Sequence, residues 1–294
     1  MDRRNLFKTM GVAAGSVLMA RDVKAAEPGA AASDTMGMLI DTTRCIGCRT
    51  CEAACAEAHQ EDGIECPEEV DFAVQRNTSE KQFTVVNRYE TEKGEVFAKK
   101  QCMHCLQPAC ASACLTKAMH KTANGSVAWT ADKCMGCRFC MVSCPFEVPK
   151  FEYFSANPRI QKCSMCWDRV KAGGQPACVE NCPAEALSFG PRSELIEEAR
   201  RRIYADPDNY VHEIYGEREA GGTGVLYLAA VPFAQLGFKT NLQDSSYPAL
   251  TREFLYAVPA VITLVPPLLV ALHRASHARN AGNAEKHDHQ EGDA

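Results

Sequence analysis

The chain has 294 residues, a formal net charge of −5 and 17 cysteines. This length accommodates one large domain or two smaller ones, and the mixed charge gives no indication of a nucleic-acid-binding surface. The high cysteine content leaves three candidates: disulfides, zinc sites and iron–sulfur clusters.

Residues 1–25 have the features of an export signal. Arg3 and Arg4 precede a modest apolar run over residues 9–20, which is too short for a stable membrane span. Small residues around Ala25 suit cleavage by signal peptidase. The twin-arginine pathway carries folded cargo, which suits a protein that must bind its cofactors before export. We therefore predict a twin-arginine signal peptide at residues 1–25, with an amphipathic first helix as the alternative.

Sixteen of the 17 cysteines fall into four groups, which we call quartets I to IV. They are quartet I (Cys45, Cys48, Cys51, Cys55), quartet II (Cys102, Cys105, Cys110, Cys114), quartet III (Cys134, Cys137, Cys140, Cys144) and quartet IV (Cys163, Cys166, Cys178, Cys182). Quartets I and III read C-x2-C-x2-C-x3-C. In bacterial ferredoxins the first three cysteines of such a run bind one [4Fe–4S] cluster and the fourth binds its neighbour.

The spacing favours iron–sulfur clusters over the other two uses of cysteine. Disulfides are common in exported proteins, but neighbouring C-x2-C pairs suit a shared metal centre better than crosslinks between distant segments. Zinc ribbons use isolated C-x2-C pairs, whereas quartets I and III have a third cysteine at the same step. We therefore predict four [4Fe–4S] clusters, and we assign no ligand role to Cys66, which lies outside every quartet.

The segments around the quartets predict an internal repeat of strand, cysteine loop, short helix and strand. The predicted elements are a strand at 38–40, a helix at 53–59, a hairpin of 83–86 and 95–98, a hairpin turning at Asn124-Gly125, a strand at 186–190, a helix from Ser193, its N-cap, to about Tyr204, and a strand at 225–231. The predicted fold class is α+β, with tandem ferredoxin-like modules in residues 26–250. The core would be small, so the clusters would also act as structural staples.

The C-terminal part contains a candidate membrane anchor. Phe254 to Leu272 is a stretch of 19 residues without a charge, about 28 Å long as a helix and close to the thickness of a bilayer core. We predict a transmembrane anchor at 251–273, and a buried core helix is the alternative. Arg274 and Arg279 follow directly, which places the C-terminus in the cytoplasm, and residues 274–294 form a disordered polar tail.

The four quartets resemble those of the four-cluster iron–sulfur subunits of respiratory complexes. This family includes the electron-transfer subunits of formate dehydrogenase N, dimethyl sulfoxide reductase, tetrathionate reductase and quinone-linked [NiFe] uptake hydrogenases, the HybA type. Spacing alone leaves the pairing of the quartets open, whereas the resemblance implies that I pairs with IV and II with III. The implied ligand sets are set A (Cys45, Cys48, Cys51, Cys182), set B (Cys55, Cys163, Cys166, Cys178), set C (Cys102, Cys105, Cys110, Cys144) and set D (Cys114, Cys134, Cys137, Cys140).

Within that family the chain is most similar to the hydrogenase type. It has its own twin-arginine signal, the segment Lys99–Cys105 leads into quartet II, and residues 215–232 precede a single C-terminal anchor. The resemblance implies a non-catalytic subunit in the inner membrane, with its cluster domain in the periplasm. Electrons would pass from hydrogenase catalytic subunits through four clusters to a multi-span quinone-reactive membrane subunit.

Two other functions remain open from the sequence. One is the β subunit of a respiratory formate dehydrogenase or other molybdoenzyme, and the other is a membrane-tethered redox sensor. Beyond the quartets we find no nucleophile–base constellation, nickel-site cysteine pair or molybdopterin signature, which argues against a catalytic role. Five basic residues adjoin the ligands and are candidates for raising a cluster potential, or else solvated charges: Arg44, Arg49, Lys133, Arg138 and Lys162.

Overall fold

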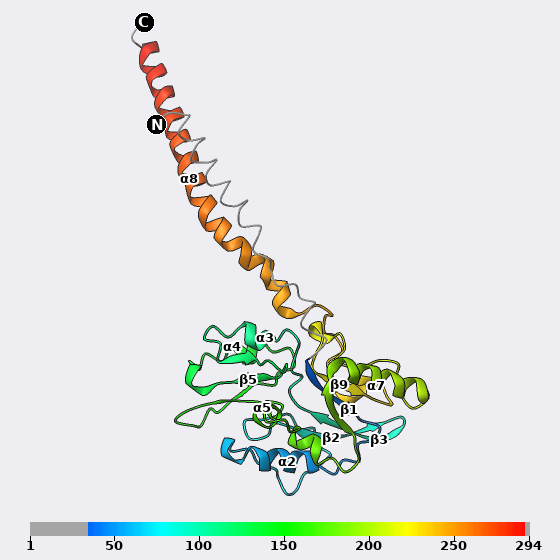
Figure 1. The fold of residues 1–294 in the computed structure, drawn as a ribbon. Coiled ribbons are helices and arrows are strands. Elements are labelled where there is room, and N and C mark those ends of the chain that lie inside the picture. The colour runs from blue at the N-terminus through cyan, green and yellow to red at the C-terminus, as the bar shows by residue number, and fades with distance from the viewer. Residues whose placement is uncertain (1–34, 292–294) are drawn as a thin grey trace.

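The computed structural model describes residues 35–291, and the predicted signal peptide at 1–25 lies outside them. The described chain forms a body of short strands and short helices, with one long helix, α8 (Tyr247–Glu291), projecting away from it (Figure 1). The mixed α and β content and the C-terminal apolar helix agree with the predicted fold class.

A three-stranded sheet joins the beginning of the described chain to its later part. Its strands are β1 (Met36–Asp41), β8 (Leu187–Pro191) and β9 (Val225–Leu228). The central strand β1 is antiparallel to β8 and parallel to β9. Central strands are covered on both faces, and β1 is accordingly a nearly continuous apolar run.

The two faces of this sheet pack against different layers. Met38, Ile40 and Tyr227 belong to the larger core, which also includes the cysteine Cys178. Leu39 points to the opposite face, as the two-residue period of a strand requires, and packs with the apolar side of helix α7 (Arg192–Ala205). The sheet therefore separates α7 from the cysteine-rich part of the molecule (Figure 1).

Three small antiparallel ladders complete the strands. They are β2 (Val85–Thr91) with β3 (Gly94–Lys100), β4 (Met119–Lys121) with β5 (Val127–Trp129), and β6 (Lys150–Phe151) with β7 (Ile160–Gln161). The first two are the hairpins predicted from the sequence, although β2 begins two residues later than predicted, at Val85, and both β2 and β3 continue past their predicted ends. The turn of the first closes with the pairing of Thr91 and Gly94.

The loops of quartets I and III follow the same backbone path. Gly47 and Arg49 have φ values of 71° and 60°, and Gly136 and Arg138 have values of 70° and 60°. Left-handed backbone is easy for glycine but costs energy for arginine. Its recurrence at equivalent positions shows that the sequence repeat is also a structural one.

Short helices follow or carry the ligand cysteines. They are α2 (Thr50–Ala58), α3 (Ala109–Ser112), α4 (Phe139–Ser143), α5 (Trp167–Lys171) and α6 (Ala177–Glu180). Helix α2 packs against α6, and α3 packs against α4. Quartet I thus lies beside quartet IV, and quartet II lies beside quartet III.

The predicted helix after quartet IV is present, but its predicted cap is wrong. Helix α7 begins at Arg192, so Ser193 is inside the first turn, and the N-cap position is Pro191 without a side-chain hydrogen bond. The helix starts earlier because strand β8 ends at Pro191 and α7 follows it without an intervening loop. Glu194 and Arg202 lie in the first and last turns, as the helix dipole favours.

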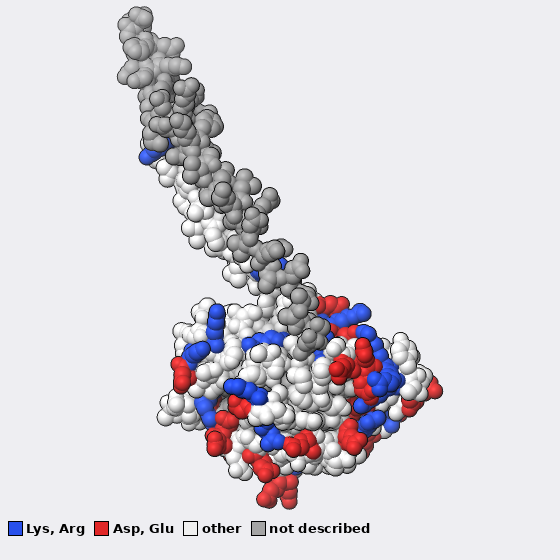
Figure 2. All heavy atoms as spheres, viewed as in Figure 1, with Lys and Arg blue, Asp and Glu red and all other residues white. Residues whose placement is uncertain are grey.

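Helix α8 differs in length from the predicted anchor. It runs without a break to Glu291 and contains Pro259, Pro266 and Pro267, so residues 274–291, predicted as a disordered tail, are helical. Its segment Tyr247–His277 is long and apolar enough to cross a membrane, by length and composition only, and none of its most apolar stretch is buried. Figure 2 shows an uncharged surface along the visible middle of α8.

Candidate metal centres

Set A gathers three cysteines of quartet I and the last cysteine of quartet IV. Cys45, Cys48, Cys51 and Cys182 line one cavity. The apolar side chains of Ile40, Ile46 and Leu187 and the side chain of Lys99 complete the walls. Cys48 is exposed, whereas the other three cysteines are half-buried, so this centre lies near the surface of the body.

Set B is the most deeply enclosed of the four. Cys55, Cys163, Cys166 and Cys178 line a second cavity and all four are buried. His59 lies at its edge, where Nε2 is 3.6 Å from Cys166 Sγ and Nδ1 is 3.1 Å from an Asp62 carboxylate oxygen.

Set C brings together three cysteines of quartet II and the last cysteine of quartet III. Cys102 and Cys110 are buried, and Cys105 and Cys144 are half-buried. Burial raises the pKa of Cys105 well above its usual range, and the proximity of Cys102, Cys144 and Cys110 raises it further. The four thiols are therefore close enough to interact.

Set D is formed by the last cysteine of quartet II and the first three of quartet III. Cys114, Cys134, Cys137 and Cys140 line a cavity with Met119, Trp129 and Ile160 in its wall. Cys137 is exposed. The indole Nε1 of Trp129 is buried and has no hydrogen-bond partner among the described residues, so an N–H donor remains available in the wall of this cavity.

The buried thiols of these sets suit coordination to the iron atoms of iron–sulfur clusters. Burial raises the pKa of Cys51, Cys110 and Cys163 to about 12, so these thiols stay protonated unless a cation compensates their charge. Coordination to a metal supplies that compensation and deprotonates a thiol. Within residues 35–291 no three His, Cys, Asp or Glu side chains converge on one single-ion position; in sets A, B and D the four cysteines border a cavity instead.

Comparison with known proteins identifies the family. Residues 94–192, which include quartets II to IV, match the family described as the 4Fe-4S dicluster domain. The chain is 44% identical over 296 residues to a protein of Nitratidesulfovibrio vulgaris strain Hildenborough, covering 97% of this chain and 80% of the relative. It is 33% identical over 334 residues to the hydrogenase-2 operon protein HybA of Escherichia coli O157:H7, covering 99% and 98%.

A formate dehydrogenase subunit is similar over a shorter range. The chain is 36% identical over 202 residues to the iron–sulfur subunit of the nitrate-inducible formate dehydrogenase of Escherichia coli K12, covering 65% of this chain and 66% of the relative. The chain belongs to the ferredoxin-type iron–sulfur subunits of respiratory enzymes. Within this family it is an electron-transfer subunit that uses [4Fe–4S] clusters.

The structure separates the five basic candidates near the ligands into different environments. Arg44 is half-exposed beside Asp41, and Lys133 is exposed. Arg49 is bound to Glu52 and to backbone oxygens of the insertion between quartets I and II. Arg138 lies over the rings of Phe151 and Tyr153. Lys162 is buried and bonds the carbonyls of Val127 and Cys163, so it is not a solvated charge.

A sixth basic residue, which reasoning about neighbouring charges missed, is the most enclosed. Lys99 lies in β3 with only 2% of its surface exposed and lines the cavities of both set A and set B. It is three positions from the nearest ligand in sequence, and a hairpin strand brings it there. Burial along β3 does not alternate at this point, since the neighbours Ala98 and Lys99 are both buried, so no period-two pattern in the sequence marked this position.

Two further features lie apart from the four sets. Cys66 is half-exposed, with Arg49 Nη2 3.6 Å from its Sγ.

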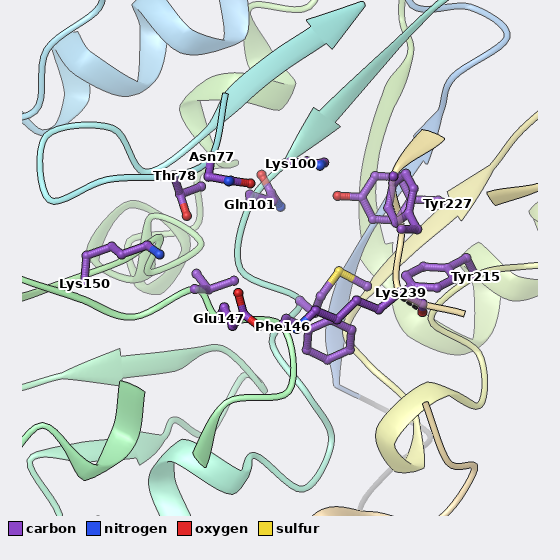
Figure 3. Close-up of a pocket in the computed structure, with 14 residues that line it drawn as sticks. Asn77, Thr78, Lys100, Gln101, Phe146, Glu147, Lys150, Tyr215, Tyr227 and Lys239 are labelled. Atoms are coloured by element: carbon purple, nitrogen blue, oxygen red, sulfur yellow. Dashed lines mark hydrogen bonds and ion pairs between the residues drawn. The ribbon is translucent and has the colours of Figure 1, made fainter. Parts of the chain in front are cut away.

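A separate pocket is lined by Lys100, Glu147, Tyr215 and Lys239, among other residues (Figure 3). The phenol of Tyr215 donates to the Lys239 carbonyl at 3.0 Å, and no cysteine lines this pocket.

Proposed function

We propose that this protein is the membrane-anchored iron–sulfur subunit of a quinone-linked [NiFe] hydrogenase. It carries electrons from a periplasmic catalytic subunit through four [4Fe–4S] clusters to a multi-span, quinone-reactive membrane subunit. Sets A to D hold the clusters, and the chain itself is not catalytic. When bound, such clusters accept and donate single electrons at potentials that the protein adjusts.

The observation that carries this proposal is the gathering of cysteines from distant parts of the chain. Cys182 lies more than a hundred residues after quartet I, yet it shares a cavity with Cys45, Cys48 and Cys51. Cys178, four positions earlier, lines the cavity of set B instead. This is the exchange of the fourth ligand that two neighbouring ferredoxin clusters require. Apolar side chains in the same walls limit the access of water to the sulfurs.

The arrangement of the helices supports two separate docking ends. Helix α2 of quartet I lies on the side of the body away from α8, whereas α3 and α4 lie on the side from which α8 departs (Figure 1). Helix α3 packs against the start of α8, and Ser246 Oγ lies 2.6 Å from Gln107 Oε1, so these two groups are hydrogen-bonded. This supports entry of electrons near exposed Cys48 and exit near exposed Cys137.

Apolar side chains around set D support its contact with a membrane subunit. Leu115, Met135, Phe139 and Val142 flank its cysteines and are all more than half exposed. Exposed apolar patches of this kind are typical of protein interfaces. For the anchor, the proposal is supported by the apolar segment of α8, which is long enough to cross a membrane. Arg274 directly after it favours a C-terminus in the cytoplasm and a body in the periplasm.

The extent of similarity favours a hydrogenase partner over a formate dehydrogenase. The alignment with HybA spans 98% of that protein, including the C-terminal part, whereas that with the formate dehydrogenase subunit spans 66%. The shared cluster core nevertheless makes the β subunit of a formate dehydrogenase or other molybdoenzyme the second candidate.

Two measurements test the proposal. Anaerobically prepared protein is expected to contain about sixteen iron atoms per chain, and markedly fewer would contradict the four clusters. The native complex is expected to copurify with nickel and to reduce quinone with H2. Copurification with molybdenum or tungsten would instead support the second candidate.

A further inference from the structure

Lys99 occupies a position between two of the proposed clusters. Its side chain lines the cavity of set A together with Cys51 and the cavity of set B together with Cys55 and Cys178. The residue is almost fully buried, with 2% of its surface exposed. One ammonium group therefore adjoins both sets of thiols.

Apart from the thiols, few groups stabilise the positive charge of Lys99. It donates to the side-chain oxygen of Gln101, and among residues 35–291 no carboxylate lies within ion-pair distance of it. The nearby buried carboxylate of Glu52 is already bound to Arg49 and Arg76. A buried charge without an opposite charge costs several kcal/mol, so the thiolates of the two sets are the groups that stabilise Lys99.

We propose that Lys99 is a charge shared by sets A and B that raises the reduction potentials of both clusters together. This inference rests on the proposed function, in which the two sets hold [4Fe–4S] clusters. Adding an electron makes a cluster more negative, so a fixed positive charge nearby stabilises the reduced state. The effect is strong because water does not screen a buried charge.

The selectivity of the effect follows from position. Lys99 lines the cavities of set A and set B and is not among the residues that line the cavity of set D. In set C, burial raises the pKa of Cys110 and the buried ammonium of Lys162 opposes that rise. Lys99 therefore links two of the four centres and leaves the other two to different groups.

The test is redox potentiometry of the anaerobic full-length protein, followed by electron paramagnetic resonance. The variant Lys99→Met removes the charge and keeps the length and apolar stem of the side chain. We expect the reduction equilibria of two clusters to shift at least tenfold toward the oxidised state, which is 59 mV for a one-electron couple. The equilibria of the other two clusters should not move.

A matched control lies one residue further along the same strand. Lys100 faces the opposite side of β3, on the wall of the separate pocket (Figure 3), with its Nζ 5.8 Å from the Tyr89 ring centroid. Lys100→Met removes the same charge from a partly solvated position and is expected to leave all four potentials unchanged.

The possible outcomes separate a failure of the role proposed for Lys99 from a failure of the proposed function. Unchanged potentials in Lys99→Met protein with full iron content overturn the inference but not the proposed function. Iron missing from the unmodified protein contradicts the proposed function itself. If Lys99→Met protein does not retain iron, the polar variant Lys99→Gln is measured, and loss of iron in both variants overturns the tuning role in favour of a structural one.

Discussion

The strongest test of the ligand arrangement compares Cys182→Ala with Cys178→Ala. The two cysteines belong to one quartet and lie four residues apart, yet they line different cavities. Cys182→Ala is expected to destroy the cluster of set A and to spare set B. Cys178→Ala is expected to do the reverse. Sequence proximity alone would predict the same damage from both substitutions.

The size of the effect follows from the grouping of the cysteines. The sixteen quartet cysteines form four sets of four, so the complete loss of one cluster removes about four of about sixteen iron atoms, one quarter of the total. Each substitution removes one ligand of four from one set and none from the others. Iron and sulfide analysis measures the total, and electron paramagnetic resonance of the reduced protein shows which signal is absent.

Two reference variants identify the missing signals. Cys48→Ala removes a ligand of set A from quartet I, and Cys163→Ala removes a ligand of set B from quartet IV. The spectrum of Cys182→Ala should match that of Cys48→Ala, and the spectrum of Cys178→Ala should match that of Cys163→Ala. If Cys182→Ala instead reproduces the spectrum of Cys163→Ala, the exchange of ligands between quartets I and IV is refuted.

Four further substitutions or truncations follow from the same structure. Cys144→Ser is expected to remove the cluster of set C and spare set D, and spectra showing loss of set D alone would refute this. Trp129→Phe removes the unpartnered indole N–H in the wall of the set D cavity. If this N–H donates to the set D cluster, the variant lowers the reduction potential of that cluster in redox titration. An unchanged potential would exclude such a hydrogen bond. Asp41→Asn removes the buried carboxylate that pairs with the mostly buried Arg202, 3.0 Å away, and should reduce the free energy of unfolding by about 1.5–3 kcal/mol in denaturant titration, because Arg202 keeps its second partner Glu198. A change below about 1 kcal/mol would show that the pair contributes little. A chain ending at Ser246 lacks α8 and should leave the membrane fraction when it is produced without partner subunits; retention there would argue against α8 as the anchor.

Local sequence patterns were sufficient for features whose physical cause is local. The spacing of Cys134, Cys137 and Cys140 predicts the cofactor because a cluster needs several thiolates within a few residues of one another. Asn124-Gly125 predicts its hairpin because the turn requires residues that tolerate left-handed backbone. The uncharged run in α8 likewise contains all the information needed to recognise an apolar segment of membrane-spanning length.

The ends of the helices were predicted less well, because helical and non-helical conformations compete at a helix end. Ser193 has the chemistry of an N-cap, but β8 continues directly into α7, so the helix starts at Arg192. The polar residues after His273 suggest disorder by composition, whereas α8 continues through them to Glu291. In both places the boundary of the helix depends on the strand or helix that adjoins it, and local composition does not contain that information.

By itself, the sequence determined that sixteen cysteines form four quartets suited to [4Fe–4S] clusters, and that an apolar segment follows them. Only the tertiary structure brought Cys182 beside quartet I and placed the ammonium of Lys99 between two sets of thiols. The physical reason is distance along the chain: spacing within a quartet is set by a few local dihedral angles. Which quartets meet depends on the packing of α2 against α6, to which residues more than a hundred positions apart contribute. Which charge is buried between them depends on β3, which carries Lys99 into the walls of both cavities.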